Sequence, residues 1–234
     1  MKIDYALMSC NSNPLYLNFW PVVSKVWEQK FNIRPILIYV DNVDINISEE
    51  FGEVIKLKPV KGINDIVQSQ FARLWYSQFF KDSICIISDI DMIPLSLGYF
   101  KTQFSPINDN EYVITSFDGN HINICYNVAS GNNFKKYLKL FDDWESQINL
   151  IKDDKLFYEN NEISWSADEI FLTKQLKNKS YKYLKRDLTT TRIDRSKWEY
   201  DIGKLKLGMY YDCHSIRPYD THKNEIDKLI NYIL

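Results

Sequence analysis

The segment that most constrains this chain is residues 83–95, which read SICIISDIDMIPL. It begins with an apolar, β-branched run typical of a buried strand, and Pro94 ends the regular structure. Side chains two positions apart on an extended backbone point to the same side, so Asp89 and Asp91 would share one crevice. Two carboxylates this close repel each other unless a cation lies between them. The segment therefore predicts a divalent-metal site for a phosphorylated ligand at the end of a central strand, with a chance Asp-x-Asp in a loop as the alternative.

Hydrophobic periodicity organises the first 90 residues into alternating strands and helices. Short apolar runs or alternation predict strands, and apolar residues at helical spacing predict helices. The strands are predicted at residues 3–9, 34–40, 53–57 and 83–89, and the helices at residues 14–30 and 64–80. Pro21 would kink or split the first helix. The order β-α-β-β-α-β predicts an α/β fold with a mostly parallel central sheet flanked by helices.

The rest of the chain changes in pattern but shows no domain boundary. Strands are predicted at residues 111–116, 122–127 and 208–211, and amphipathic helices at residues 131–148, 166–176 and 220–234. Residues 186–207 are charged and predicted to be irregular. Without a repeat or a low-complexity linker, residues 1–234 are interpreted as a single domain.

Composition excludes several classes of protein. With 29 basic and 31 acidic residues and no long Lys/Arg run, no nucleic-acid partner is expected. No apolar stretch is long enough for a transmembrane segment, and Asp4 interrupts the apolar N-terminus, so no signal peptide is predicted. The four cysteines are far apart and form no Cys-x-x-Cys pair, which predicts free thiols in a reducing compartment and a cytoplasmic protein.

Missing glycine motifs exclude further classes. The turn after the first strand, residues 10–14, reads CNSNP rather than a Gly-x-Gly-x-x-Gly turn, so NAD or FAD binding is not expected. There is no Gly-Lys-Ser/Thr of a P-loop and no Gly-x-Ser-x-Gly of an α/β-hydrolase.

Four other polar positions are candidates for chemistry. His214 follows the late strand and could be a third metal ligand, or a surface histidine. Asp168 and Glu169 open a helix, where either could be a general base or a simple complement to the helix dipole. Arg73 could contact a phosphate or pair with a nearby acid.

Several stretches together resemble a known family. They are residues 9–16, 68–75, 88–95, 124–131, 165–169 and 212–214. In this order they look like a GT-A fold glycosyltransferase of the DxD type, similar to the small ones encoded by large DNA viruses of algae. The resemblance implies a nucleotide-sugar donor, usually a UDP-sugar, with Mn²⁺ or Mg²⁺ bridging its diphosphate.

The resemblance also implies roles for individual residues. Asp91 and His214 would bind the metal, and Asp89 would contact the ribose, or the metal through water. The donor would be bound by Cys10, Asn11, Ser12 and Asn13 along the nucleoside, by Arg73 and Arg217, and by Asn127 and the turn at residues 129–131 beside the sugar. Either Asp168 or Glu169 would be the acceptor-side acid.

These roles divide the chain into a nucleotide-binding half, residues 1–95, and an acceptor-side half, residues 96–234. The expected activity is transfer of a sugar to a hydroxyl of a glycan or glycoconjugate, in the cytoplasm of the host if the chain is viral. Two alternatives remain: a nucleotidyl- or phosphotransferase using the same carboxylates, and a non-catalytic sugar- or partner-binding domain.

Overall fold

A central sheet is the core of the fold. The computed structural model describes residues 1–160 and 162–234, and within them seven strands pair in the order β10-β6-β7-β4-β1-β2-β3. Their bounds are β1 Tyr5–Cys10, β2 Arg34–Val40, β3 Glu53–Leu57, β4 Ile84–Ile87, β6 Val113–Ile114, β7 Asn127–Ser130 and β10 Lys182–Tyr183. The pairs β1–β2, β2–β3, β1–β4 and β10–β6 are parallel, whereas β4–β7 and β6–β7 are antiparallel. The predicted mostly parallel α/β sheet is therefore confirmed.

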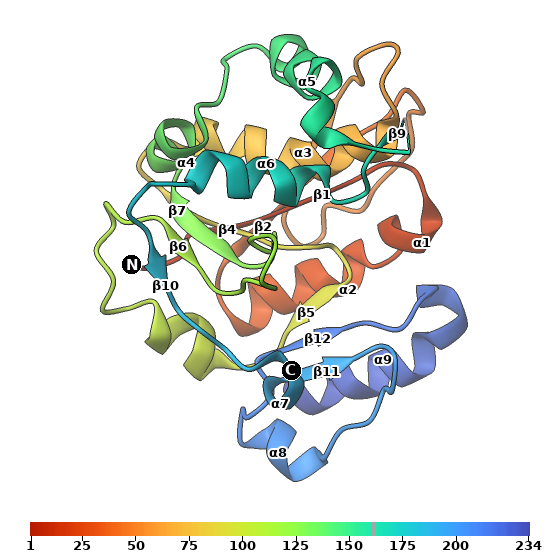
Figure 1. Ribbon diagram of the computed structural model, residues 1–234. Coiled ribbons are helices and arrows are strands. Elements are labelled where there is room, and N and C mark those ends of the chain that lie inside the picture. Colours follow the sequence, from red (N-terminus) through yellow and green to blue (C-terminus); the bar gives the residue numbers. More distant parts are fainter. Residues whose placement is uncertain (161) are drawn as a thin grey trace.

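Helices cover both faces of this sheet (Figure 1). Their bounds are α1 Pro14–Leu17, α2 Trp20–Lys25, α3 Asp65–Tyr76, α4 Gly131–Leu138, α5 Trp144–Asp153, α6 Ala167–Leu176, α7 Leu188–Thr191, α8 Ile202–Lys206 and α9 Tyr219–Ile233. Helices α3, α4 and α6 lie over one face, and α2 lies over the other. The sheet is thus covered as expected for an α/β fold.

The first half of the chain follows its sequence pattern closely. Strands β2 and β3 have the predicted bounds, and the first predicted helix is divided into α1 and α2. Pro21 lies in the first turn of α2, where its missing N–H costs no helical hydrogen bond. Asn13 caps α1 by accepting a hydrogen bond from the Leu15 amide at 3.0 Å. Local signals of this kind need no tertiary contact to act, which explains the agreement.

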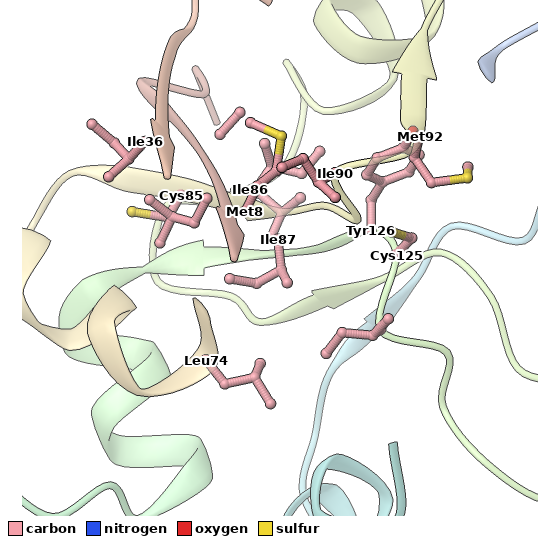
Figure 2. Close-up of a cluster of buried hydrophobic side chains, with 14 of the residues drawn as sticks. Met8, Ile36, Leu74, Cys85, Ile86, Ile87, Ile90, Met92, Cys125 and Tyr126 are labelled. Atoms are coloured by element: carbon pink, nitrogen blue, oxygen red, sulfur yellow. The ribbon is translucent and has the colours of Figure 1, made fainter. Parts of the chain in front are cut away.

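Strand β4 lies in the middle of the core. All four of its side chains are buried, which requires apolar residues on both faces of the strand. Figure 2 shows Cys85, Ile86 and Ile87 of this strand packed with Met8 of β1 and Leu74 of α3. The polar residues that follow β4 are consequently fixed to the most buried part of the molecule.

A glycine allows α4 to approach its neighbours closely. A Cβ atom on Gly131 would lie 2.5 Å from the Lys81 amide nitrogen and 2.6 Å from the Ser77 carbonyl oxygen. Both are backbone atoms and cannot move aside independently, so the packing of α4 requires glycine at this position.

Two predictions in the middle of the chain were wrong. Residues 122–127 do not form a strand: Ile122 makes an isolated bridge to Phe117, and β7 begins only at Asn127. The helix predicted at residues 131–148 is two helices, α4 and α5, because Lys139 adopts a left-handed conformation that ends α4. A continuous amphipathic pattern does not reveal such a break.

The C-terminal part forms a second, smaller sheet. It has the order β11-β12-β5, with β11 at Arg192–Asp194, β12 at Asp212–His214 and β5 at Met92–Pro94. The late strand is thus β12 and not the predicted residues 208–211, and residues 186–207 contain α7, β11 and α8 instead of being irregular. Figure 1 shows α9 beside this sheet, where Ile226, Leu229 and Ile230 are buried, which confirms the predicted final helix.

A two-stranded hairpin of β8 (Tyr158–Glu159) and β9 (Glu162–Ile163) precedes α6. Among the described helices, none combines the length and the apolar character that crossing a membrane requires.

Candidate functional site

A pocket of about 300 Å³ opens beside the polar ends of β1 and β4. Ten of the residues singled out from the sequence line it: Cys10, Asn11, Asn13, Arg73, Asp89, Asp91, Asp168, Glu169, His214 and Arg217. They come from segments spread over most of the chain. The volume is at the lower end of the range for small-molecule sites, and several charged groups converge in it.

Of the positions expected to bind the donor, Ser12, Asn127 and residues 129–131 do not line the pocket. Residues 129–131 form no turn, because β7 runs to Ser130 and α4 begins at Gly131. The amide of Ser12 donates a hydrogen bond to Asp41 Oδ2 at 2.9 Å. Asn127 is fully buried, and its Nδ2 donates to the carbonyl oxygens of Asn123 and Ile124 at 2.8 and 2.7 Å. Asn127 therefore holds the loop before β7 in place.

Arg73 on α3 connects two of the carboxylates. Its Nη1 pairs with Asp89 Oδ1 and donates to the Ser88 carbonyl at 3.0 Å, and its Nη2 lies 3.1 Å from Asp168 Oδ2. Burial opposes the charge of Arg73, but the attraction of Asp89 and Asp168 outweighs it, so the pKa of the guanidinium is raised. A buried arginine with two acidic partners is a fixed, permanent cation in the floor of the pocket.

Asp89 is held from both sides. Besides its pairing with Arg73, its Oδ2 accepts a hydrogen bond from Cys125 Sγ at 3.1 Å, and its amide donates to the same sulfur at 2.9 Å. Burial alone would raise the pKa of Asp89, but Arg73 and the Cys125 thiol lower it below its usual value. Burial raises the pKa of Cys125 well above its usual value, so the thiol keeps the proton that it donates.

The carboxylate of Asp91 faces two arginines and one histidine. Its Oδ2 lies 3.3 Å from Arg195 Nη1, 3.5 Å from His214 Nε2 and 3.5 Å from Arg217 Nε. The antiparallel pair β5–β12 sets this arrangement, because it places His214 opposite Met92, and the Ser215 amide donates to the Asp91 carbonyl at 3.0 Å. Backbone pairing thus brings His214 to Asp91 across more than half of the chain.

Two of the three side chains expected at a metal ion are free to receive one. Within residues 1–160 and 162–234, no group of three or more His, Cys, Asp or Glu side chains is arranged to hold a metal ion. Asp89 is engaged with Arg73 and Cys125, which leaves Asp91 and His214 as the converging pair. Adjacent ligands of an octahedral ion with bonds near 2.1 Å lie about 3 Å apart. The 3.5 Å between Asp91 Oδ2 and His214 Nε2 fits two such positions after a small adjustment.

Asp168 and Glu169 lie in the first turn of α6, on the other side of Arg73. Burial raises the pKa of Asp168 to about 7, although the charge of Arg73 opposes this shift. Burial also raises the pKa of Glu169, whose Oε1 accepts a hydrogen bond from the Ile124 amide at 3.0 Å. Ser166 precedes α6 as predicted, but its side chain makes no capping hydrogen bond. The two acids therefore have different environments: Glu169 fixes a loop, whereas Asp168 faces Arg73 in the pocket.

Sequence reasoning gave no role to several pocket residues, of which Arg195, Tyr16 and Trp165 are the most informative, although Tyr16 and Trp165 lie in stretches that carry the resemblance. Arg195 follows β11 in a segment predicted to be irregular, and only the pairing of β11 with β12 brings it near Asp91. The Tyr16 ring lies 4.9 Å from the Arg217 guanidinium, and its centroid is 6.5 Å from that of Trp165. Trp165 has 59% of its surface exposed at the pocket rim, an unusual place for a tryptophan without a ligand. The closeness of Trp165 to Asp168 in the sequence was the one signal that could have placed Trp165 at the pocket.

Comparison with known proteins gives similarity in structure alone. No model of a known protein family matches the chain. No curated protein matches it in sequence either.

Solved glycosyltransferase structures share its fold. An active-site mutant of LgtC has a TM-score of 0.56 at 11% identity, covering 97% of this chain and 94% of that one. A glycosyltransferase involved in glycosylation of the major capsid of PBCV-1 has a TM-score of 0.52 at 10% identity, with 96% and 99% covered. GlyE of Streptococcus pneumoniae TIGR4 has a TM-score of 0.53 at 14% identity, covering all of this chain and 61% of the other. The chain therefore has the GT-A-like fold of these glycosyltransferases, as its resemblance to the family predicts.

Proposed function

We propose that this protein is a metal-dependent glycosyltransferase that transfers a sugar from a nucleotide-sugar, most simply a UDP-sugar, to a hydroxyl group of a glycan or glycoconjugate. The observation that carries the proposal is the convergence of Asp91, His214 and Arg217 in a pocket that Arg73 and Asp168 also line. Asp91, His214 and Arg217 would hold a cation and a diphosphate, and Arg73 and Asp168 would act beside the reacting sugar. The shared fold supports the same conclusion.

The donor would lie along the strand ends of residues 1–95. The loop of Cys10, Asn11 and Asn13 borders the pocket, and the nucleoside would lie along it. The diphosphate would lie near Arg217, whose planar guanidinium suits phosphate oxygens. Asp91 and His214 would hold Mn²⁺ or Mg²⁺, which supplies positive charge to the leaving diphosphate. Residues 96–234 would form the acceptor side, and they also contribute the cations that face Asp91.

Of the two acids, we assign the acceptor-side role to Asp168. As the acceptor oxygen bonds to the anomeric carbon and the bond to the diphosphate breaks, the hydroxyl proton must be removed. A carboxyl group with a pKa of about 7 is suited to accept a proton near neutral pH. Arg73, at 3.1 Å, orients this carboxylate, whereas Glu169 anchors the Ile124 amide at 3.0 Å. We also place the protein in the cytoplasm, of the host if it is viral, because its four cysteines are buried free thiols.

Calorimetric titration of UDP tests the donor site. We expect the unmodified protein to bind UDP in Mn²⁺ and to bind it much more weakly in EDTA. Asp91→Ala should bind UDP weakly both in Mn²⁺ and in EDTA. Asp153→Ala, an exposed acid at the end of α5, is the matched control and should bind like the unmodified protein. If UDP does not bind, GDP and dTDP are titrated in the same way. Absence of binding for all three nucleotides would overturn the proposal, and metal-independent binding that survives in Asp91→Ala would favour a non-catalytic binding domain.

A further inference from the structure

One oxygen of Asp91 faces nitrogen atoms of three side chains. Arg195 Nη1, His214 Nε2 and Arg217 Nε lie 3.3, 3.5 and 3.5 Å from Asp91 Oδ2. Charge-assisted hydrogen bonds between nitrogen and oxygen are typically 2.7–2.9 Å long. All three contacts are longer than this, so none of them is a strong bond that another ligand would have to break.

Charge balance differs between two groups of charged residues in the pocket. Arg73 is matched by two carboxylates, those of Asp89 and Asp168. Around Asp91, two arginines, Arg195 and Arg217, face one carboxylate. The surroundings of Asp91 therefore have an excess positive charge that an anionic group would neutralise.

The two arginines are held differently. Arg217 stacks over the Tyr16 ring at 4.9 Å and has 19% of its side chain exposed. Arg195 has 35% of its side chain exposed, and among the residues that the structure describes Asp91 is its one acidic partner. Arg195 can therefore change partners at a small cost in free energy, because it loses a single long contact, that with Asp91, at a partly exposed position.

We propose that Arg195 is a phosphate-binding residue of this pocket, with two alternative partners: Asp91, as in this structure, and the diphosphate of a bound nucleotide. By moving to the diphosphate, Arg195 leaves Asp91 to a divalent cation. The same residue thus opposes binding of the cation alone and favours binding of the cation together with the nucleotide. This inference rests on the proposed function, because it needs a nucleoside diphosphate in the pocket.

The proposal predicts effects of opposite sign on two ligands. In Arg195→Gln, UDP affinity measured calorimetrically in Mn²⁺ should fall about tenfold, because a charged contact to phosphate is lost. The affinity for Mn²⁺ alone, followed by electron paramagnetic resonance of the free ion, should rise about threefold, because a cation next to Asp91 has gone. Arg195→Lys should recover part of the UDP affinity. Lys197→Gln, an exposed cation two residues away, is the control and should change neither.

Other outcomes would refute the inference in distinguishable ways. If UDP affinity is unchanged in Arg195→Gln, Arg195 does not bind phosphate, although the proposed function stands. If affinities for UDP and for Mn²⁺ alone both fall, Arg195 merely holds Asp91 in position and the inference is wrong. If the unmodified protein binds no nucleoside diphosphate at all, the proposed function fails first, and the inference with it.

Discussion

Asp168 should make the stability of the protein depend on pH in a way that one substitution removes. Burial raises its pKa in the folded protein to about 7, from an ordinary value of 3.8. The folded state therefore holds a proton that the unfolded state releases at a lower pH. Stability from such a group is fully present below the unfolded pKa and is lost as pH rises through the folded one. At 1.36 kcal/mol per pKa unit, the loss across the whole window is about 4 kcal/mol, of which about 2–3 kcal/mol falls between pH 5 and pH 8.

Urea unfolding at pH 5 and pH 8 measures this contribution directly. The unmodified protein should lose about 2–3 kcal/mol more stability than Asp168→Asn over this interval, because asparagine has no proton to release. Asp143→Asn is a suitable control, because Asp143 is the N-cap of α5 and hydrogen bonds from Ser146 lower the pKa of its carboxyl group. The titration of Asp143 therefore lies below pH 5. Any effect of this control on stability should be equal at both pH values.

If the unmodified protein and Asp168→Asn lose the same amount of stability between pH 5 and pH 8, this reasoning is refuted. The Arg73 guanidinium would then keep Asp168 ionised in the folded protein, and a role for Asp168 as proton acceptor near neutral pH would lose its physical basis. If the reasoning is right, the rate of sugar transfer should rise with pH through an apparent pKa near 7.

Two further substitutions test how the charges of the site are supported. Cys125→Ala removes both sulfur contacts of Asp89, so it should lower the free energy of unfolding in urea by about 1–3 kcal/mol and should also lower the affinity for UDP. Cys125→Ser should keep most of the stability and most of the UDP affinity. Equal loss in the two variants would show that the sulfur acts by packing alone. Asp212→Asn leaves the buried guanidinium of Arg186, 2.6 Å away, without its counter-charge and should cost about 3–5 kcal/mol in the same assay; a loss below about 1 kcal/mol would show that Arg186 finds another partner.

The sequence predicted well those parts of the fold that short-range signals control. Strands β2 and β3 were correct to the residue, and the first helix divides just before Pro21, which lies in the first turn of α2, as the chemistry of proline favours. The prediction failed where non-local pairing decides. Strand β12 was placed a few residues early because its neighbours β11 and β5 lie about 20 and 120 residues away in the chain.

The same distinction holds for the candidate site. Asp89 and Asp91 were recognisable because a buried strand and a proline bracket them. Arg195 was not, because its approach to Asp91 depends on the pairing of β11 with β12. Asn127, expected at the sugar, is fully buried and outside the pocket lining, since an asparagine in a motif does not show which way its side chain points.

The pairing of β5 with β12 has a consequence for how this site can change over evolution. His214 lies opposite Met92, next to Asp91, through a backbone ladder that does not depend on which side chains the two strands carry. Most substitutions along these strands should leave the spacing of the two residues intact. An insertion or deletion of a single residue in β12 would turn His214 to the opposite face of the small sheet. The site should therefore tolerate extensive drift in residue identity, but hardly any change in the length of these two strands.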